Sequence, residues 1–121
     1  MDERHIAVFG CGSWGSNIVH TLSDLGCLRA VVDPSAAGRS RARRRAPDVA
    51  VFDEGGPVLA DPAVKAVMIA TPAETHYRVA RAALDAGKDV FVEKPMTVDV
   101  DDARELVARA RIAERILMVG H

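Results

Sequence analysis

The sequence predicts an α/β protein with a doubly wound, six-stranded parallel sheet and helices on both faces. Short apolar runs of strand length alternate with helical patterns, and this alternation is typical of a parallel sheet covered by helices. The first apolar run leads through a glycine-rich turn into a helix, as the first crossover of a doubly wound sheet does. Because 121 residues suffice for one core, we expect residues 1–121 to form one domain.

The strands are placed from their apolar runs, and the helices from their periodic faces and stop signals. Strands are expected over residues 6–9, 28–32, 49–52, 66–70, 89–92 and 116–119. Helices are expected over residues 17–25, 35–46, 72–86 and from 99 or 101 to 115, with one helical turn near 58–60. With a crossover after each strand, we predict the strand order 3-2-1-4-5-6.

Several start signals coincide before the helix expected over 72–86. Thr71 is a good N-cap, Pro72 suits the first helical position, and Glu74 stands where a capping box needs its acid. We therefore predict an α-helix that begins directly after Thr71.

The turn after the first strand, Gly10-Cys11-Gly12-Ser13-Trp14-Gly15, fits the pattern G-x-G-x-x-G. Gly10 permits the tight turn, Gly12 lets the backbone approach a pyrophosphate, and Gly15 lets the helix lie close to the strand. Unpaired N–H groups and the dipole at the helix N-terminus favour an anion there. The strand before this motif and the helix after it indicate a dinucleotide site.

Asp33 ends the second strand, 18 residues after Gly15. A carboxylate at this place accepts hydrogen bonds from the adenosine ribose hydroxyls and repels a 2′-phosphate, so NAD is favoured over NADP. Asp33-Pro34-Ser35 also suits a turn, and the two roles are compatible. An arginine of the next helix could instead take a 2′-phosphate, but we favour a solvated basic face for Arg39, Arg41, Arg43, Arg44 and Arg45.

Composition argues against several other classes. The net charge of −1 gives no global attraction to nucleic acid or to an anionic membrane, and the arginine cluster contains no aromatic residue that could stack on a base. No apolar run approaches the roughly 20 residues that span a bilayer, and no signal-peptide pattern precedes the first strand. We expect the 2 cysteines to be free thiols, no metal site, and a cytoplasmic protein.

The features that could carry chemistry all follow the carboxyl ends of strands, where doubly wound sheets bind their ligands. They are the glycine turn at 10–15, Asp33, Thr71-Pro72 and Glu93-Lys94-Pro95. Together they predict the dinucleotide site of a Rossmann fold. Lys94 could hydrogen-bond a ribose or substrate hydroxyl and exchange a proton with it, or could form a surface pair with Glu93.

Two further side chains allow alternative interpretations. His76 either faces the cofactor or is a hydrogen-bonded histidine on a helix face, and Trp14 either covers the pyrophosphate or packs on the first strand. The Lys94–Pro95 bond is one of the few in the chain that could be cis.

Three segments carry a resemblance to a known family: GCGSWGSN, ATPAETHYRVARAALDAGKDVFVEKPMT and LMVGH. They resemble the N-terminal half of the glucose–fructose oxidoreductase / inositol dehydrogenase family (Gfo/Idh/MocA), and most of all its UDP-N-acetylglucosamine-type 3-dehydrogenase branch. The combination A-T-P-x-x-x-H with V-E-K-P is the specific part. The resemblance implies NAD(P)-dependent oxidoreductases that act on sugars, sugar nucleotides, inositols and related polyols.

The resemblance also implies roles for individual residues. It places Lys94 in the family's catalytic Glu-Lys-Pro motif and implies that the Lys94–Pro95 bond is cis. Together with the glycine turn and Asp33, it gives an expected set of cofactor contacts: Gly10, Gly12, Ser13, Trp14, Gly15, Asp33, Pro34, Ala70, Thr71, Pro72, His76, Glu93, Lys94 and Pro95.

Members of the family continue into a second α/β domain that supplies the substrate pocket and much of the oligomer interface. The resemblance therefore implies a cofactor domain that binds NAD but turns over poorly alone, because nothing holds a sugar against the nicotinamide. The alternative function is a stand-alone module that binds or senses NAD without catalysis, which would have no need for Glu93-Lys94-Pro95. An adenosylmethionine-dependent methyltransferase would leave both that segment and Thr71-Pro72 unexplained.

Overall fold

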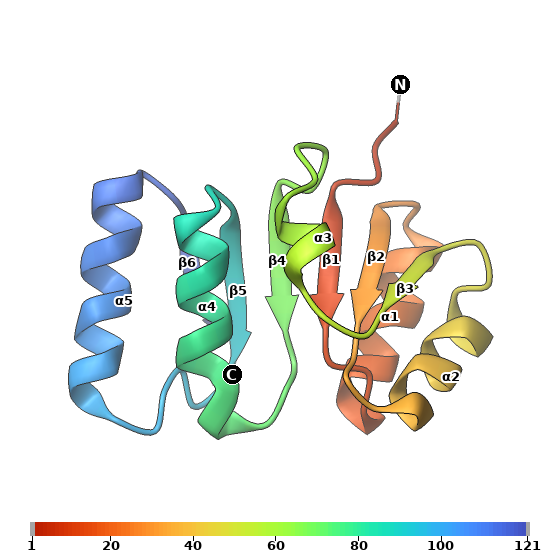
Figure 1. Ribbon diagram of the computed structural model, residues 1–121, viewed down its shortest axis with the longest axis horizontal. Coiled ribbons are helices and arrows are strands. Elements are labelled where there is room, and N and C mark those ends of the chain that lie inside the picture. The colour runs from red at the N-terminus through yellow and green to blue at the C-terminus, as the bar shows by residue number, and fades with distance from the viewer. Residues whose placement is uncertain (1, 121) are drawn as a thin grey trace.

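The computed structural model describes residues 2–120, which form one parallel sheet with helices on both faces (Figure 1). The sheet has 6 strands in the order β3-β2-β1-β4-β5-β6, so the predicted Rossmann arrangement is confirmed. The strands are β1 (Ile6–Phe9), β2 (Leu28–Val32), β3 (Ala50–Phe52), β4 (Ala66–Ile69), β5 (Asp89–Glu93) and β6 (Leu117–Gly120).

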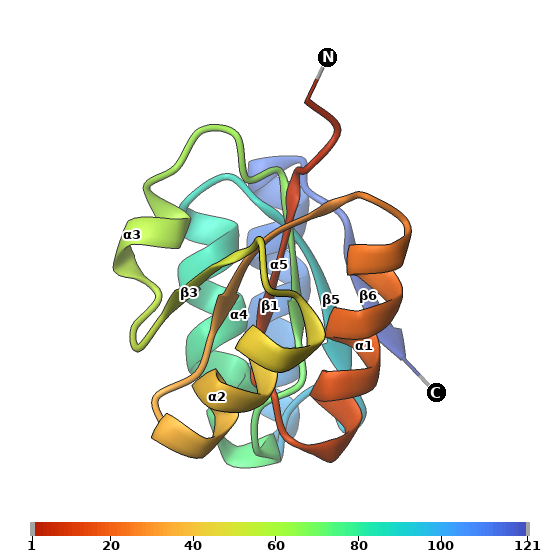
Figure 2. The ribbon, with the colours of Figure 1, turned by 90° about the vertical axis from the view of Figure 1, so that its right-hand side faces the viewer.

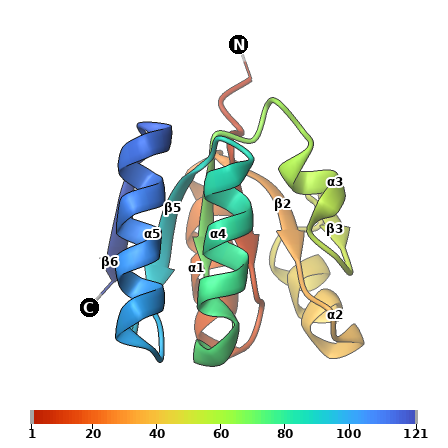
Figure 3. The ribbon, with the colours of Figure 1, turned by 60° about the vertical axis from the view of Figure 1, so that its left-hand side comes forward.

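The helices fill the crossovers between consecutive strands. They are α1 (Ser13–Asp24), α2 (Ala36–Arg45), α3 (Gly56–Leu59), the short 3₁₀ helix η1 (Ala73–Thr75), α4 (His76–Asp85) and α5 (Val100–Ala113). Helices α1 and α2 lie on one face of the sheet, and α3, α4 and α5 lie on the other (Figures 1, 2 and 3).

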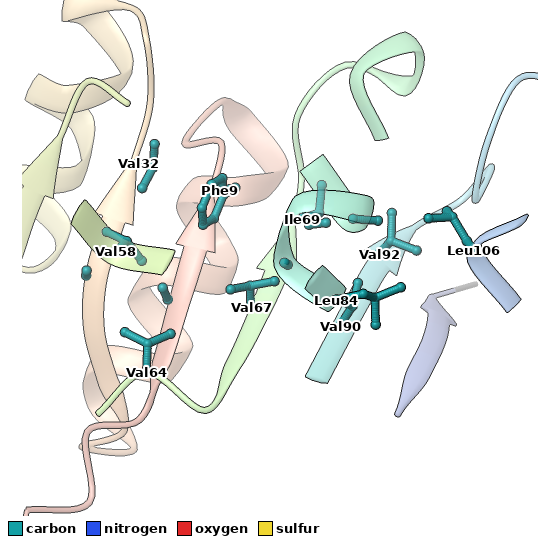
Figure 4. Packing of buried hydrophobic residues seen from close by; sticks show 14 of the residues in the cluster. Phe9, Val32, Val58, Val64, Val67, Ile69, Leu84, Val90, Val92 and Leu106 are labelled. Atoms are coloured by element: carbon teal, nitrogen blue, oxygen red, sulfur yellow. The ribbon is translucent and has the colours of Figure 1, made fainter. Parts of the chain in front are cut away.

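Each face of the sheet has its own apolar core. On the α1–α2 face, Val8 and Val31 pack against Val19 and Leu22 of α1. On the opposite face, alternate strand residues pack against Leu84 of α4 and Leu106 of α5 (Figure 4). The alternation along each strand follows from the pleat, and burial on both faces explains why the strands are nearly continuous apolar runs.

Most element ends agree with the predicted ones to within a few residues, and one of the differences bears on the site. Helix α1 begins at Ser13, four residues before the predicted start, because it incorporates the second half of the glycine turn. Asp99 is the N-cap of α5, and its side chain accepts hydrogen bonds from the backbone N–H groups of Asp101 and Asp102. Gly26 and Gly87 have positive φ after α1 and α4, a conformation in which helices commonly end at glycine.

The predicted α-helical start after Thr71 is wrong. The segment forms the 3₁₀ helix η1 with Pro72 as N-cap and no side-chain cap, and the α-helix begins only at His76. The Thr75 hydroxyl donates to the Pro72 carbonyl oxygen at 2.6 Å, and it also lies 2.7 Å from the Thr71 hydroxyl. These local bonds replace the capping box that Thr71 and Glu74 would have formed.

Candidate cofactor-binding site

The loops that follow β1, β2, β4 and β5 meet at one edge of the sheet, because parallel strands all end on the same side. In Figure 1 the arrowheads of β1, β4 and β5 point to this lower edge, where α1 also begins. Hydrogen bonds continue the ladder beyond the strands: Gly10 N–H donates to the Val32 carbonyl and Ala70 N–H to the Phe9 carbonyl, each at 2.8 Å. The edge is therefore ordered before any ligand binds.

The glycine turn leaves no room for side chains at two of its glycines. A Cβ on Gly15 would lie 2.0 Å from the Gly10 carbonyl oxygen, and one on Gly10 would lie 2.7 Å from the backbone of Ala70. Gly10 also has a φ of +97°, which L-residues rarely adopt. The turn, the helix and the end of β4 are thus in backbone-to-backbone contact.

Gly12 differs from these two, because a Cβ there would meet no protein atom within 4 Å. It is the N-cap of α1, and no side chain caps the helix. The first N–H groups of an uncapped helix point at whatever lies beyond its end, and the helix dipole favours negative charge there. The open space at Gly12 and the uncapped N–H groups fit a dinucleotide pyrophosphate.

The Asp33 carboxylate is 8% exposed and is held by three hydrogen bonds. Its Oδ2 accepts from the Cys11 N–H at 2.8 Å. Its Oδ1 accepts from the Ser35 N–H at 2.8 Å and from the Ser35 hydroxyl at 2.9 Å. Burial raises the pKa of this carboxyl, but the hydrogen bonds from Cys11 and Ser35 outweigh burial and hold the pKa below its ordinary value. Asp33 is therefore a fixed anion that ties the glycine turn to the end of β2.

Gly38 is a residue of this site that the sequence analysis did not single out. It lies in α2, and a Cβ there would be 2.1 Å from Asp33 Oδ2. Ser35, the N-cap of α2, accepts from the Gly38 N–H at 3.0 Å. A glycine inside a helix ordinarily costs stability, so its presence in an alanine- and arginine-rich helix was the available signal.

The predicted solvated basic face of α2 is wrong for two of its arginines. Arg41 is half-buried and donates to the Cys11 carbonyl oxygen. Arg39 is half-buried too and donates to the Asp33 and Pro34 carbonyl oxygens at 3.0 and 2.8 Å. Arg45 is exposed and donates to the Ser16 hydroxyl at 3.1 Å. Backbone carbonyls of the turns attract these guanidinium groups, which a helical periodicity pattern does not reveal.

Trp14 links the glycine turn to the end of β5. Its indole Nε1–H donates to Glu93 Oε1 at 2.8 Å, and the ring is 58% exposed. The bond spans the edge of the sheet between the start of α1 and the Glu93-Lys94-Pro95 segment. Of the two alternatives for Trp14, packing on β1 does not describe this exposed position.

The Glu93-Lys94-Pro95 segment follows β5, and its Lys94–Pro95 bond is cis, as the resemblance implied. The Lys94 side chain is exposed, and its ammonium makes no hydrogen bond or ion pair with residues 2–120. It lies on the same edge as Asp33 and the glycine turn. Lys94 is thus available to a ligand, unlike the buried Lys88, which donates to the Asp61 carbonyl oxygen at 2.8 Å.

His76 lies beneath the loops that follow β4 and β5. The residue is 2% exposed, and both ring nitrogens contact carbonyl oxygens, those of Thr71 and Pro95. Of the two alternatives for His76, the described contacts match the hydrogen-bonded histidine. Whether it also contacts a cofactor stays a prediction.

The chain also contains residue types that can bind metal ions, among them 2 cysteines. Both cysteines are free thiols, as expected, and Cys11 is fully buried, which raises the pKa of its thiol; the Asp33 charge raises it further. Within residues 2–120, no group of three or more His, Cys, Asp or Glu side chains is placed to hold a metal ion. Over the same residues, no helix has the length and apolar character needed to cross a membrane.

An uncapped helix after a glycine turn, with a fixed acid at the end of the second strand, defines a dinucleotide-binding domain of the Rossmann class. Residues 4–121 match the family model described as an oxidoreductase family with an NAD-binding Rossmann fold. The chain belongs to this family, Gfo/Idh/MocA, and it is an NAD-binding domain of it.

Individual relatives agree with the family assignment. Inositol 2-dehydrogenase of Mycolicibacterium smegmatis is 36% identical over 124 residues, which cover 99% of this chain and 36% of that protein. The structure of UDP-N-acetylglucosamine 3-dehydrogenase GnnA from Acidithiobacillus ferrooxidans has a TM-score of 0.89 at 30% identity. The match covers 100% of this chain and 39% of GnnA. The structure of GenD2 from gentamicin A biosynthesis, solved in complex with NAD, has a TM-score of 0.86 at 32% identity. The match covers 99% of this chain and 35% of GenD2. The chain spans about a third of the length of these proteins.

Substitution of Gly38 by alanine tests the contact with Asp33. Glycine to alanine inside a helix normally stabilises by about 1 kcal/mol. Here we expect the opposite sign, because the new Cβ would displace the Asp33 carboxylate, and we expect weaker NAD⁺ binding as well. Urea denaturation and calorimetric titration measure the two effects. Ser40→Ala on the exposed side of α2 is the control and should change neither; a more stable Gly38→Ala would contradict the account.

Proposed function

We propose that this chain is the cofactor domain of an NAD-dependent dehydrogenase that oxidises a ring carbinol of a sugar, sugar nucleotide or polyol. One observation carries the proposal. Three features lie on one edge of the sheet: the uncapped N-terminus of α1 in the glycine turn, the fixed Asp33 anion and the free Lys94 ammonium. A site that only binds a dinucleotide needs the first two. A lysine presented beside them supplies a group that can move a proton.

We propose that Asp33 sets the preference for NAD over NADP. Its two oxygens are fixed by the Cys11 and Ser35 donors, so the charge cannot turn away from a ligand that arrives at the end of β2. A 2′-phosphate placed beside this charge is repelled, whereas ribose hydroxyls can donate to it. Arg39 and Arg41, the arginines nearest to this turn, already donate to backbone carbonyls, which supports the same preference.

We propose that Lys94 takes the proton of the substrate hydroxyl. When bound, the nicotinamide supplies the hydride acceptor for the carbinol carbon. Oxidation of an alcohol also releases the hydroxyl proton. A lysine within reach of that oxygen can receive this proton when its side chain is the neutral amine, and the positive charge then rests on the ammonium that forms. Its neighbour Glu93 accepts a hydrogen bond from Trp14 through Oε1 and, within the described residues, makes no ion pair with the Lys94 ammonium.

The substrate class rests on the relatives. Inositol and UDP-N-acetylglucosamine, named for the two dehydrogenases above, share a ring carbon that bears a secondary hydroxyl. Since the chain spans about a third of such proteins, we propose that residues outside it hold the substrate and that these residues alone bind cofactor without turnover.

Titration with NAD⁺ and NADP⁺ tests the cofactor part of the proposal. We expect NAD⁺ to bind more tightly than NADP⁺. Asp33→Ala should weaken the binding of NAD⁺ by roughly tenfold, because a hydrogen bond to a charged group is lost, and should bring the affinities for NAD⁺ and NADP⁺ closer together. Calorimetry gives the affinities, and the emission of Trp14, the single tryptophan, reports binding at the site. Asp48→Asn, an exposed acid away from this edge, is the control. Tighter NADP⁺ binding by the unchanged chain would assign specificity to the arginines instead.

A chimera tests the role of Lys94. Residues 1–121 would replace the matching third of the Acidithiobacillus UDP-N-acetylglucosamine 3-dehydrogenase, whose fold they share. We expect NADH formation from the chimera, and a loss of about 10²–10⁴-fold in Lys94→Met, the range general acid–base catalysis contributes. Lys65→Met, an exposed lysine at the opposite end of β4, should retain activity. Full activity in Lys94→Met, with NAD⁺ affinity unchanged, would remove Lys94 from the mechanism.

A further inference from the structure

The buried imidazole of His76 faces two acceptors. Nδ1 lies 2.7 Å from the Pro95 carbonyl oxygen, and Nε2 lies 2.8 Å from the Thr71 carbonyl oxygen. Both are hydrogen-bond distances. A carbonyl oxygen can only accept, so each contact requires a hydrogen on the ring nitrogen.

A neutral imidazole cannot satisfy both contacts. It carries one N–H, and its other nitrogen is an acceptor with a lone pair. In the neutral ring that lone pair would face a carbonyl oxygen at hydrogen-bond distance. Because the residue is 2% exposed, water does not replace the missing hydrogen bond. The imidazolium has two N–H groups and fits both acceptors.

The two carbonyls belong to the two loops of the proposed reaction site. Thr71 follows β4, and Pro95 follows β5 and comes directly after Lys94. His76 itself begins α4, so the ring joins the start of this helix to both loops. At this end, β5 is otherwise held by its pairing with β4 and β6 and by the Trp14–Glu93 bond.

The charges around the ring come from few groups. The ionisable side chains at the end of β5, in the two loops and in the first turn of α4 are Glu74, Tyr77, Arg78, Glu93, Lys94 and Asp99. Within residues 2–120 none of them makes an ion pair with the imidazole. The N-terminal end of α4 disfavours a cation. Two charge-assisted hydrogen bonds oppose that, and each is roughly twice as strong as a neutral one.

We propose that His76 is an imidazolium in the folded protein and a positioning residue that holds the Lys94 loop against the Thr71 loop. Loss of its proton breaks one of the two bonds and loosens the loop that carries Lys94. The link to Lys94 rests on the function proposed above; the protonation state does not.

Nitrogen-15 NMR of the ring tests the protonation state directly. In the labelled chain at about pH 7, where an unperturbed histidine is largely neutral, we expect both nitrogens of His76 to have the shifts of protonated nitrogen. His20, which is exposed and lies 3.3 Å from Asp24, is the internal reference for the ring signals. A His76 ring with one bare nitrogen at this pH would overturn the proposal.

Substitution of His76 by glutamine tests the positioning role. The amide can donate from its nitrogen to one carbonyl, but its other polar atom is an oxygen, so one bond is lost. We expect a folded protein by circular dichroism, a lower thermal midpoint, and NAD⁺ binding about tenfold weaker, equivalent to one charge-assisted bond. His20→Gln, at an exposed position of α1, is the matched control and should bind NAD⁺ as the wild type does.

The outcomes separate the two proposals. A His76→Gln protein with wild-type affinity for NAD⁺ would overturn the positioning role. If no form of the chain binds NAD⁺, the proposed function fails, while the NMR shifts and the thermal midpoints still decide whether the clamp exists.

Discussion

The contact between Gly15 and the carbonyl of Gly10 is the constraint from which the site follows. With no side chain possible at Gly15, the backbone of α1 lies directly on the turn that leaves β1. This places the uncapped end of the helix at the carboxyl edge of the sheet, next to the ends of β2 and β4. A larger residue would push the helix away, and the N–H groups would no longer point over the edge.

The Asp33 carboxylate transmits this constraint to the neighbouring strand and helix. Its bond to the Cys11 N–H fixes the turn, its bonds to Ser35 fix the start of α2, and Gly38 leaves the room that the carboxylate occupies. A charge with so little exposure is costly unless it is hydrogen-bonded, so the same contacts that stabilise it also fix its position. Recognition of the ribose would then require no rearrangement of the protein.

The sequence was sufficient for the sheet and its strand order, because six apolar runs and glycine stops carry that information locally. It was misleading at Thr71, where local capping signals predicted an α-helical start and the Thr75 hydroxyl bonds produced a 3₁₀ turn instead. Gly38 left one signal in the sequence, a glycine inside a helix, but periodicity does not reveal that the Asp33 carboxylate fills the space beside it. The contact of Arg41 could not be predicted, because its partner Cys11 lies 30 residues away in the sequence. The contacts of His76 with two loops are of the same kind: periodicity indicates a buried face but not the polar atoms that it meets.

The central claim is that the edge above Gly12 receives the dinucleotide pyrophosphate, and Gly12→Ala tests it most directly. A Cβ at this position would meet no protein atom within 4 Å, so the variant should unfold at the same temperature as the wild type. The same methyl group would stand where the pyrophosphate approaches the backbone, so NAD⁺ binding measured by calorimetry should fall by at least roughly tenfold. Unchanged NAD⁺ affinity in a fully folded Gly12→Ala protein would contradict the account, because the site would then lie elsewhere.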